Sequence, residues 1–304
     1  MTNPSYTRPV IKGVKCAETL PRGFALALEG GGTRGFFSAG VMDAFLKESV
    51  MFPYIVGVSA GCANALSYVA GQYGRNREIA ERYVCRHEYV SKRNLLKYGS
   101  LFGYDYIFKT IPNRHIFWDR EMFEACPARF LTGATDCVRG ETVWFEKEDV
   151  DGEFTASRAS CSVPFAAKPV KFKGMTLLDG GILAPIPIEK SLEDGNSFHV
   201  IVLTRNKGYV KPPFKGKIIS KLFYGKYPKL REALLNRHEV YNRQSALCEE
   251  LEKSGRALII RPEKPLEFDR TGNDSEKLLR LYDEGEREGL RALKVLRGLR
   301  RRER

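Results

Sequence analysis

Residues 24–47 read FALALEGGGTRGFFSAGVMDAFLK and hold the strongest local signal for the fold. The apolar run at 24–29 is typical of a buried strand, and residues 36–47 carry apolar side chains at the three- and four-residue spacing of a helix. A glycine-rich loop lies between them at 30–35. This segment therefore predicts one strand–turn–helix unit.

The next stretch repeats the pattern, with a short buried strand at 54–58 (YIVGV) and a helix at 60–70. Two such units in succession favour an α/β fold, in which helices cover a parallel sheet. We also expect a mixed, mostly helical segment at 73–125. Further strands are predicted at 130–135, 141–146, 175–178, 198–204 and 257–261.

The C-terminal part is predicted to end in a long helix at 274–302, with Asn273, Asp274 and Ser275 as candidates for its N-cap. Its apolar and small residues repeat at helical spacing on one face: Leu278, Tyr282, Gly285, Gly289, Ala292, Leu296 and Leu299. No linker divides the chain. We therefore expect one domain with an N-terminal extension (1–23), a core (24–205) and a basic, mainly helical C-terminal region (206–304) packed on the core.

A G-x-S-x-G motif, GVSAG, occupies 57–61 between a predicted strand and a predicted helix. Gly57 and Gly61 permit a sharp turn that exposes the hydroxyl of Ser59. The helix that follows directs its N-terminal N–H groups toward charge developing beside the serine. Ser59 is therefore the candidate nucleophile.

The loop GGGTRG contains Gly30, Gly31, Gly32, Arg34 and Gly35. Consecutive glycines let backbone N–H groups converge on one spot, which suits the oxyanion of a tetrahedral intermediate. The same glycines also spell a dinucleotide fingerprint, which expects an acidic residue about 20 positions further on, near the end of the next strand. That strand ends in the serine motif instead, which favours the interpretation of the loop as an oxyanion-binding site. Arg34 has two interpretations: it orients a phosphate, or it braces the loop.

The third element is Asp179-Gly180-Gly181, directly after the predicted strand at 175–178. An aspartate beside two glycines can approach another backbone closely, although Asp-Gly also occurs in ordinary turns. A serine nucleophile needs a base, which is usually histidine. None of the four histidines lies in a turn or glycine-rich context: His87, His115, His199 and His238. Asp179 is therefore the best-placed candidate base.

These three elements, in this order, resemble the patatin-like phospholipases, which combine a G-G-G-x-R-G loop, a G-x-S-x-G serine and a D-G-G or D-G-A aspartate. The resemblance covers roughly residues 24–205. Glu29 is a conservative departure, since the family often has aspartate there. Three further stretches are similar to the family pattern: 131–140 (LTGATDCVRG), 159–169 (ASCSVPFAAKP) and 179–187 (DGGILAPIP).

The resemblance implies a three-layer α/β/α fold with a mainly parallel central sheet, and release of fatty acids from glycerolipids without a metal or other cofactor. It also implies a Ser–Asp dyad, with Ser59 as nucleophile and Asp179 as general base. The amides of Gly31 and Gly32, supported by Arg34, would form the oxyanion hole. Past residue 206 the chain is similar to bacterial patatin-like proteins that carry their own C-terminal helical region.

The formal net charge is +13, from 50 basic and 37 acidic residues, and it is concentrated in two stretches. Residues 211–231 contain seven Lys or Arg and no Asp or Glu, and residues 291–304 contain seven basic residues and one acidic one. Such a surface indicates an anionic partner: a membrane, nucleic acid or acidic substrate. We find no helix-turn-helix, zinc or aromatic RNA-binding signature, which excludes nucleic acid as the expected partner.

The stretch 211–231 favours peripheral attachment to an anionic membrane, because a short helix there would present an apolar face beside lysines. The alternative is a solvated loop whose aromatic residues pack into the core. The apolar face would consist of Ile218, Ile219, Leu222 and Phe223, with Lys217 and Lys221 nearby.

The chain has no apolar run of about 18 residues, which a membrane span needs, and its start lacks the apolar core of a secretory signal. We therefore expect a cytoplasmic protein, peripheral on the inner face of the membrane. Seven scattered cysteines without a C-x-x-C pair predict neither a metal site nor a disulfide framework. Nothing in the pattern predicts an oligomeric state.

Two alternatives to a dyad hydrolase remain open at this point. One is a carboxylesterase with a Ser–Asp–His triad, because His199 and His238 both follow Asp179 in the chain. The other is a non-enzymatic lipid-binding protein that uses the basic segments. The presence of both Ser59 and Asp179 argues against an inactive relative of an enzyme.

Overall fold

The computed structural model describes residues 18–265 and 274–302. Residues 1–17 of the expected N-terminal extension (1–23) therefore lie outside the described residues. The N-cap candidate Asn273 lies outside them as well. The long helix α10 begins at Ser275 and ends at Arg302. Asp274 caps it, because its Oδ1 accepts a hydrogen bond from Lys277 N at 3.2 Å.

Within the described residues, one eight-stranded sheet forms the centre of the molecule, in the order β10-β9-β2-β4-β5-β8-β7 with β6 paired to β5. The five strands from β10 to β5 are parallel, whereas β6, β7 and β8 run antiparallel to their neighbours. The prediction of a mainly parallel sheet is thus confirmed. The strands are β2 (Phe24–Leu28), β4 (Tyr54–Val58), β5 (Arg129–Asp136), β6 (Glu141–Phe145), β7 (Val170–Phe172), β8 (Met175–Asp179), β9 (Phe198–Val202) and β10 (Ala257–Ile260), and the short β1 (Glu18–Thr19) pairs separately with β3 (Val50–Met51).

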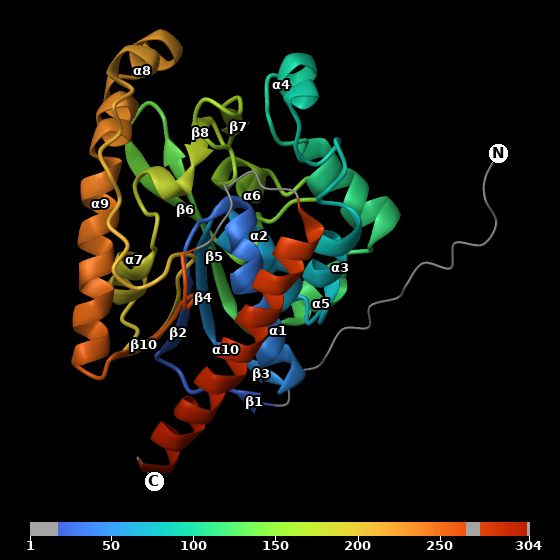
Figure 1. Cartoon of the computed structure of the whole chain (residues 1–304), viewed down its shortest axis with the longest axis vertical. Coiled ribbons are helices and arrows are strands. Elements are labelled where there is room, and N and C mark those ends of the chain that lie inside the picture. The colour runs from blue at the N-terminus through green and yellow to red at the C-terminus, as the bar shows by residue number, and fades with distance from the viewer. Residues whose placement is uncertain (1–17, 266–273, 303–304) are drawn as a thin grey trace, which may run out of the picture.

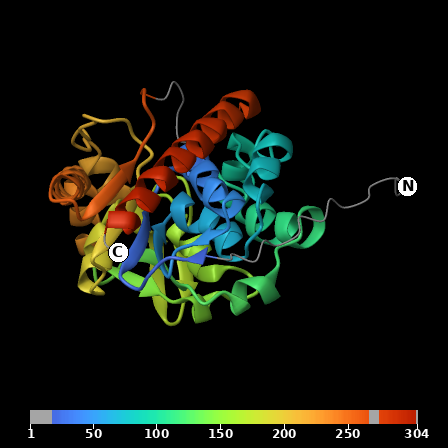
Figure 2. The ribbon, with the colours of Figure 1, turned by 90° about the horizontal axis from the view of Figure 1, so that it is seen from below.

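Helices cover both faces of this sheet, which gives three layers (Figures 1 and 2). Leu26 and Leu28 point to the face packed by α1, α2 and α10, whereas the alternate residues Ala25 and Ala27 point to the face packed by α7 and α9. The predicted α/β/α fold is therefore confirmed. The helices are α1 (Phe36–Lys47), α2 (Ala60–Val69), α3 (Arg75–Arg82), α4 (Lys92–Tyr98), α5 (Arg120–Ala125), α6 (Thr155–Ser160), α7 (Ile188–Glu193), α8 (Lys217–Tyr224), α9 (Pro228–Lys253) and α10, with the π-helix η2 (Tyr106–His115) and 3-10 turns η1 (Gly32–Gly35), η3 (Lys147–Asp149) and η4 (Gly180–Ile182).

The C-terminal region contributes to all three layers. Strand β10 extends the sheet beside β9, α9 lies on one face, and α10 lies along α1 on the other (Figure 1). The backbones of α1 and α10 approach closely, because a Cβ atom at Gly285 would lie 2.1 Å from Phe37 O and one at Gly40 would lie 2.0 Å from Tyr282 O. The face predicted for α10 therefore packs from Leu278 to Leu296, whereas the side chain of Leu299 lies outside the described part of the structure.

Candidate active site

The ends of β4 and β8 meet at neighbouring residues of β5. Strand β4 pairs with β5 as far as Val58 opposite Gly133, and β8 pairs with β5 from Asp179 opposite Ala134. Because β8 runs antiparallel to β5, its last residue arrives where β4 ends. The residue after β4, Ser59, and the last residue of β8 are thereby brought together.

The backbone at Ser59 has φ +53° and ψ −128°, a conformation that residues other than glycine seldom adopt. Ser59 N donates a hydrogen bond of 2.8 Å to Ser160 Oγ at the end of α6, and Ser160 Oγ donates in turn to Gly133 O. Helix α2 begins at Ala60, so its N-terminus faces the serine. The motif spacing did not identify Ser160, although it falls in the similar stretch 159–169.

The glycines of the serine motif serve close packing. A Cβ atom at Gly57 would lie 2.8 Å from Cys62 N, and one at Gly61 would lie 2.7 Å from Leu28 O. Neither glycine has positive φ, so the unusual backbone conformation falls on Ser59 itself. We expected these glycines to permit the turn. In the structure, their lack of a side chain lets α2 pack closely against β2 and β4.

Ser59 Oγ donates a hydrogen bond of 2.8 Å to Asp179 Oδ2, and both residues are buried. Asp179 Oδ1 accepts from Gly181 N at 2.7 Å, while Thr135 Oγ1 donates to the Asp179 carbonyl at 2.9 Å. A Cβ atom at Gly180 would lie 2.1 Å from Gly133 O. The carboxylate is therefore held in one orientation, and the glycine after it is required by the approach of β5.

The glycine-rich loop lies against the serine turn. A Cβ atom at Gly30 would lie 3.0 Å from Ser59 Cβ, and one at Gly35 would lie 2.6 Å from Ala60 Cβ. Gly32 has φ +61°, in the region that favours glycine. On the far side of the loop, a Cβ atom at Gly31 would lie 2.9 Å from Thr204 Cγ2. The loop and the serine motif thus pack as one unit.

Arg34, within this loop, and Glu29, directly before it, are both buried. Burial raises the pKa of Glu29, and the hydrogen bond from Thr204 N and the charge of Arg34 oppose that rise. Glu29 thereby ties the end of β2 to Thr204, two residues past the end of β9. This placement favours the interpretation of Arg34 as a brace of the loop.

Ser59 lines a small cavity whose surface is mainly apolar. A second small cavity shares six of its lining residues and reaches Trp118 and Phe154. Burial is the main cause that raises the pKa of the Tyr104 hydroxyl in the first cavity, so Tyr104 stays neutral. The aromatic and aliphatic residues around Ser59 are Phe36, Ala63, Tyr89, Phe102, Tyr104, Ile107, Phe108 and Val163.

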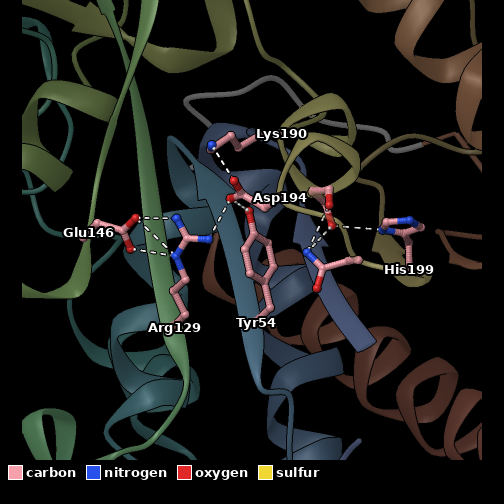
Figure 3. A network of polar contacts seen from close by, with 8 residues as sticks. Tyr54, Arg129, Glu146, Lys190, Asp194 and His199 are labelled. Atoms are coloured by element: carbon pink, nitrogen blue, oxygen red, sulfur yellow. Dashed lines mark hydrogen bonds and ion pairs between the residues drawn. The ribbon is translucent and has the colours of Figure 1, made fainter. Parts of the chain in front are cut away.

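His199 lies at the opposite end of the sheet from Ser59. His199 pairs with Ala25, and Ala25 pairs with Tyr54, the first residue of β4. The last residue of β4, Val58, lies four residues further along, which is roughly 13 Å at the rise of a strand. Burial lowers the pKa of His199 to about 4, and its Nδ1 lies 2.9 Å from Ser191 Oγ. Figure 3 shows His199 at this end, near the contacts of Asp194 with Tyr54. This histidine is not placed to act on Ser59.

His238 lies on α9, where its Nδ1 contacts Leu235 O at 3.1 Å.

Among residues 18–265 and 274–302, we find no group of three or more His, Cys, Asp or Glu side chains arranged to hold a metal ion. Over the same residues, no helix is both long and apolar enough to cross a bilayer.

A family model described as patatin-like phospholipase matches residues 26–191, more than half of the chain. The chain therefore belongs to the patatin-like phospholipase family. A second family model, described only as a domain of unknown function, matches residues 227–299. It spans α9, β10 and most of α10.

Similar proteins include the uncharacterised protein YjjU of Escherichia coli K12, 27% identical over 60% of this chain and 52% of that protein. An uncharacterised NTE family protein of Mycobacterium tuberculosis is 28% identical over 54% of this chain and 44% of that protein. Lysophospholipase NTE1 of Scheffersomyces stipitis is 27% identical over 58% of this chain but only 11% of that protein. The chain thus matches about half the length of the two bacterial relatives.

Among solved structures, VipD of Legionella pneumophila is similar over 97% of this chain and 72% of that chain, with a TM-score of 0.48 and 13% sequence identity.

Proposed function

We propose that this protein is a serine lipid acyl hydrolase that cleaves fatty acyl esters of phospholipids through Ser59 and Asp179. The contact between Ser59 Oγ and Asp179 Oδ2 carries the proposal, because it lies at a constrained turn beside an apolar cavity. An acyl chain matches the apolar lining of that cavity, and its ester carbonyl would lie against the serine.

The proposed reaction uses the chain's own groups in two steps. Asp179 accepts the proton of Ser59 Oγ as this oxygen attacks the acyl carbonyl, and a carboxylate held away from water accepts a proton more readily. The amides of Gly31 and Gly32, with the N-terminus of α2, would stabilise the oxyanion. The proton passes to the departing alcohol, and a water molecule deprotonated by Asp179 then releases the fatty acid.

The alternatives receive less support. A triad would need a histidine at Ser59 Oγ, but that oxygen donates to Asp179, and His199 lies at the other end of the sheet. A non-enzymatic lipid-binding protein would not need the strained backbone at Ser59, where φ is +53°. Such strain costs free energy and recurs at functional sites.

We further propose that α8 attaches the protein to an anionic membrane. The segment expected to form an apolar face is a helix, and Ile218 and Leu222 are 87% and 79% exposed beside the exposed Lys217 and Lys221. Tyr224 is buried and its hydroxyl accepts a hydrogen bond from Phe165 N at 2.9 Å. The helix is thus anchored at its C-terminal end while its apolar side chains face outward.

The second basic stretch is a weaker candidate for this role. Arg291 forms ion pairs with Glu263 and Glu288, and Arg297 pairs with Glu48. Part of its charge is therefore balanced within the protein. The proposed location is the inner face of the membrane.

The test of the main proposal is fatty acid release from purified phospholipids, with the products identified by mass spectrometry. We expect the wild type to release fatty acids and Ser59→Ala to release none while its thermal unfolding stays cooperative. Hydrolysis by Ser59→Ala at the wild-type rate would remove Ser59 from the mechanism.

A further inference from the structure

A broad groove lies beside the apolar cavity, between α4, the start of η2 and the residues that precede β7. Phe102 and Tyr104 line both the groove and the cavity at Ser59, so the two spaces adjoin. A molecule whose chain occupied the cavity could therefore extend a polar end into the groove.

Four cations line this groove: Arg93, Lys97, Arg158 and Lys168. Arg158 is balanced, because its guanidinium forms an ion pair of 2.7 Å with Asp105. In the described parts of the chain, 18–265 and 274–302, the other three form no ion pair with a carboxylate. Glu88, the other acidic lining residue, lies 3.4 Å from His87. With Glu88 counted and His87 neutral, the lining of the groove carries a net charge of +2, which favours an anionic ligand.

Contacts bring two of these cations to one end of α4. The ammonium group of Lys97 lies over the ring of Tyr98, 5.1 Å from its centroid. Lys168 comes from the other wall of the groove, and its side chain lies against Gly99, where a Cβ atom would be 2.4 Å from Lys168 Cε. Lysines from two separate segments therefore flank the same space.

We propose that this groove binds the phosphate headgroup of an anionic glycerophospholipid, and that Arg93, Lys97 and Lys168 determine specificity for it. This inference rests on the proposed function, because it places the acyl ester of the same molecule at Ser59. In a glycerophospholipid only a few bonds separate the ester from the phosphate, which matches a cationic groove that adjoins the acyl cavity. Charge-assisted hydrogen bonds from guanidinium and ammonium groups are the interactions that recognise phosphate.

The position of α4 agrees with entry of such a lipid from a bilayer. Helices α4 and α8 both project from the same end of the molecule's longest axis (Figure 1). On α4, Leu96 is 90% exposed between the basic residues of this helix. A lipid that leaves a membrane at this end would meet the groove before it reached Ser59.

The test compares three substrates that are dissolved as monomers, so that membrane attachment plays no part: dihexanoyl phosphatidic acid, dihexanoyl phosphatidylcholine and p-nitrophenyl butyrate. For the wild type we expect kcat/KM at least tenfold higher for the phosphatidic acid than for the phosphatidylcholine. The triple variant Arg93→Gln/Lys97→Gln/Lys168→Gln should lose about tenfold or more on the phosphatidic acid, mainly through KM. Its turnover of p-nitrophenyl butyrate should be unchanged.

Two control variants make the comparison specific. Lys97→Arg/Lys168→Arg keeps the charges and should keep the preference for the phosphatidic acid. Lys217→Gln/Lys221→Gln on α8 should leave all three monomeric substrates unaffected. Equal rates on both phospholipids, or a triple variant that behaves like the wild type, would overturn the headgroup assignment while the hydrolase stands.

Failure of the hydrolase itself has a different appearance, namely no turnover of any of the three substrates. A last arm adds inorganic phosphate. Competition with the phosphatidic acid alone supports a headgroup site. A change in p-nitrophenyl butyrate turnover that disappears in the triple variant would assign the groove to free phosphate and overturn the proposal.

Discussion

At the scale of single residues, Ser59 combines an unusual backbone conformation with two fixed hydrogen bonds. A non-glycine residue with positive φ costs on the order of 1–3 kcal/mol, and it persists only where the surrounding structure holds it in place. Here Ser160 Oγ holds its N–H and Asp179 Oδ2 accepts from its hydroxyl. The hydroxyl is therefore positioned before any substrate arrives.

We predict that Asp179→Asn lowers kcat/KM for p-nitrophenyl butyrate at least about 1,000-fold, because the amide cannot accept the proton of Ser59. Combined with Ser59→Ala, it should cause little further loss, since groups that act as one unit are not additive. The measurement is steady-state kinetics on the two single variants and the double variant.

The histidines supply the controls for this prediction. His199→Ala and His238→Ala should keep most of the activity, because neither contacts Ser59 Oγ. An inactive histidine variant beside an active Asp179→Asn would replace the dyad with a triad.

The sequence predicted the positions of the motif residues but not all of their physical roles. Gly57 and Gly61 were expected to permit a strained turn, whereas in the structure they admit the backbones of Cys62 and Leu28. Those neighbours come from other elements, so local spacing could not reveal them. Ser160 was missed for the same reason: its role depends on Gly133, which is distant in the chain.

At the scale of elements, the crossing of α1 and α10 depends on glycines. We predict that Gly285→Ala lowers the free energy of unfolding by about 1–3 kcal/mol, because its Cβ would lie 2.1 Å from Phe37 O and the helices would have to separate. The matched control is Gly298→Ala on the same helix, where a Cβ meets no atom within 4 Å. Urea unfolding should show Gly298→Ala unchanged or more stable. Equal stability of the two variants would contradict the close crossing.

The same crossing contains a buried carboxyl group, Asp43, that accepts hydrogen bonds from the Tyr282 hydroxyl and Gly74 N. Burial raises the pKa of Asp43 to about 7. The folded protein therefore holds a proton here that the unfolded chain releases near pH 4, so this group makes stability fall as pH rises from about 4 to 7.

We predict that Asp43→Asn removes this contribution to the pH dependence of the unfolding free energy, which amounts to on the order of 4 kcal/mol between pH 4 and 7. The measurement is the difference in unfolding free energy between variant and wild type across this pH range. The lowered pKa of His199 acts with the opposite sign, since stability falls as pH drops from about 6.5 to 4, and it cancels in the comparison. A difference that does not change with pH would refute the prediction.

Helix α8 should control membrane binding. We predict that Lys217→Glu/Lys221→Glu weakens co-sedimentation with anionic vesicles by at least tenfold, because each lysine contributes about 1 kcal/mol near such a surface. Binding of the wild type should fall steeply with salt. Arg291→Gln/Arg297→Gln is the control and should bind normally. Equal binding to neutral vesicles would refute an electrostatic attachment.

At the scale of the whole molecule, two strand–turn–helix units were enough to predict the α/β fold, whereas the strand order was not predictable. Strand β7 has only three residues and was not expected, and the antiparallel direction of β8 has no local signal. Yet that direction is what brings Asp179 to Ser59. The order of the three motifs resembles a known family, and only that resemblance predicted that Ser59 and Asp179 act together.

The central claim is that the whole fold presents one activated serine at the apolar cavity. The most direct measurement is labelling with a fluorophosphonate, which forms a covalent bond to a serine whose hydroxyl is activated by a base. Intact mass and peptide mapping should show a single adduct on Ser59, with much slower labelling of Asp179→Asn and none of Ser59→Ala. An adduct on another residue, or an unlabelled wild type, would contradict the account.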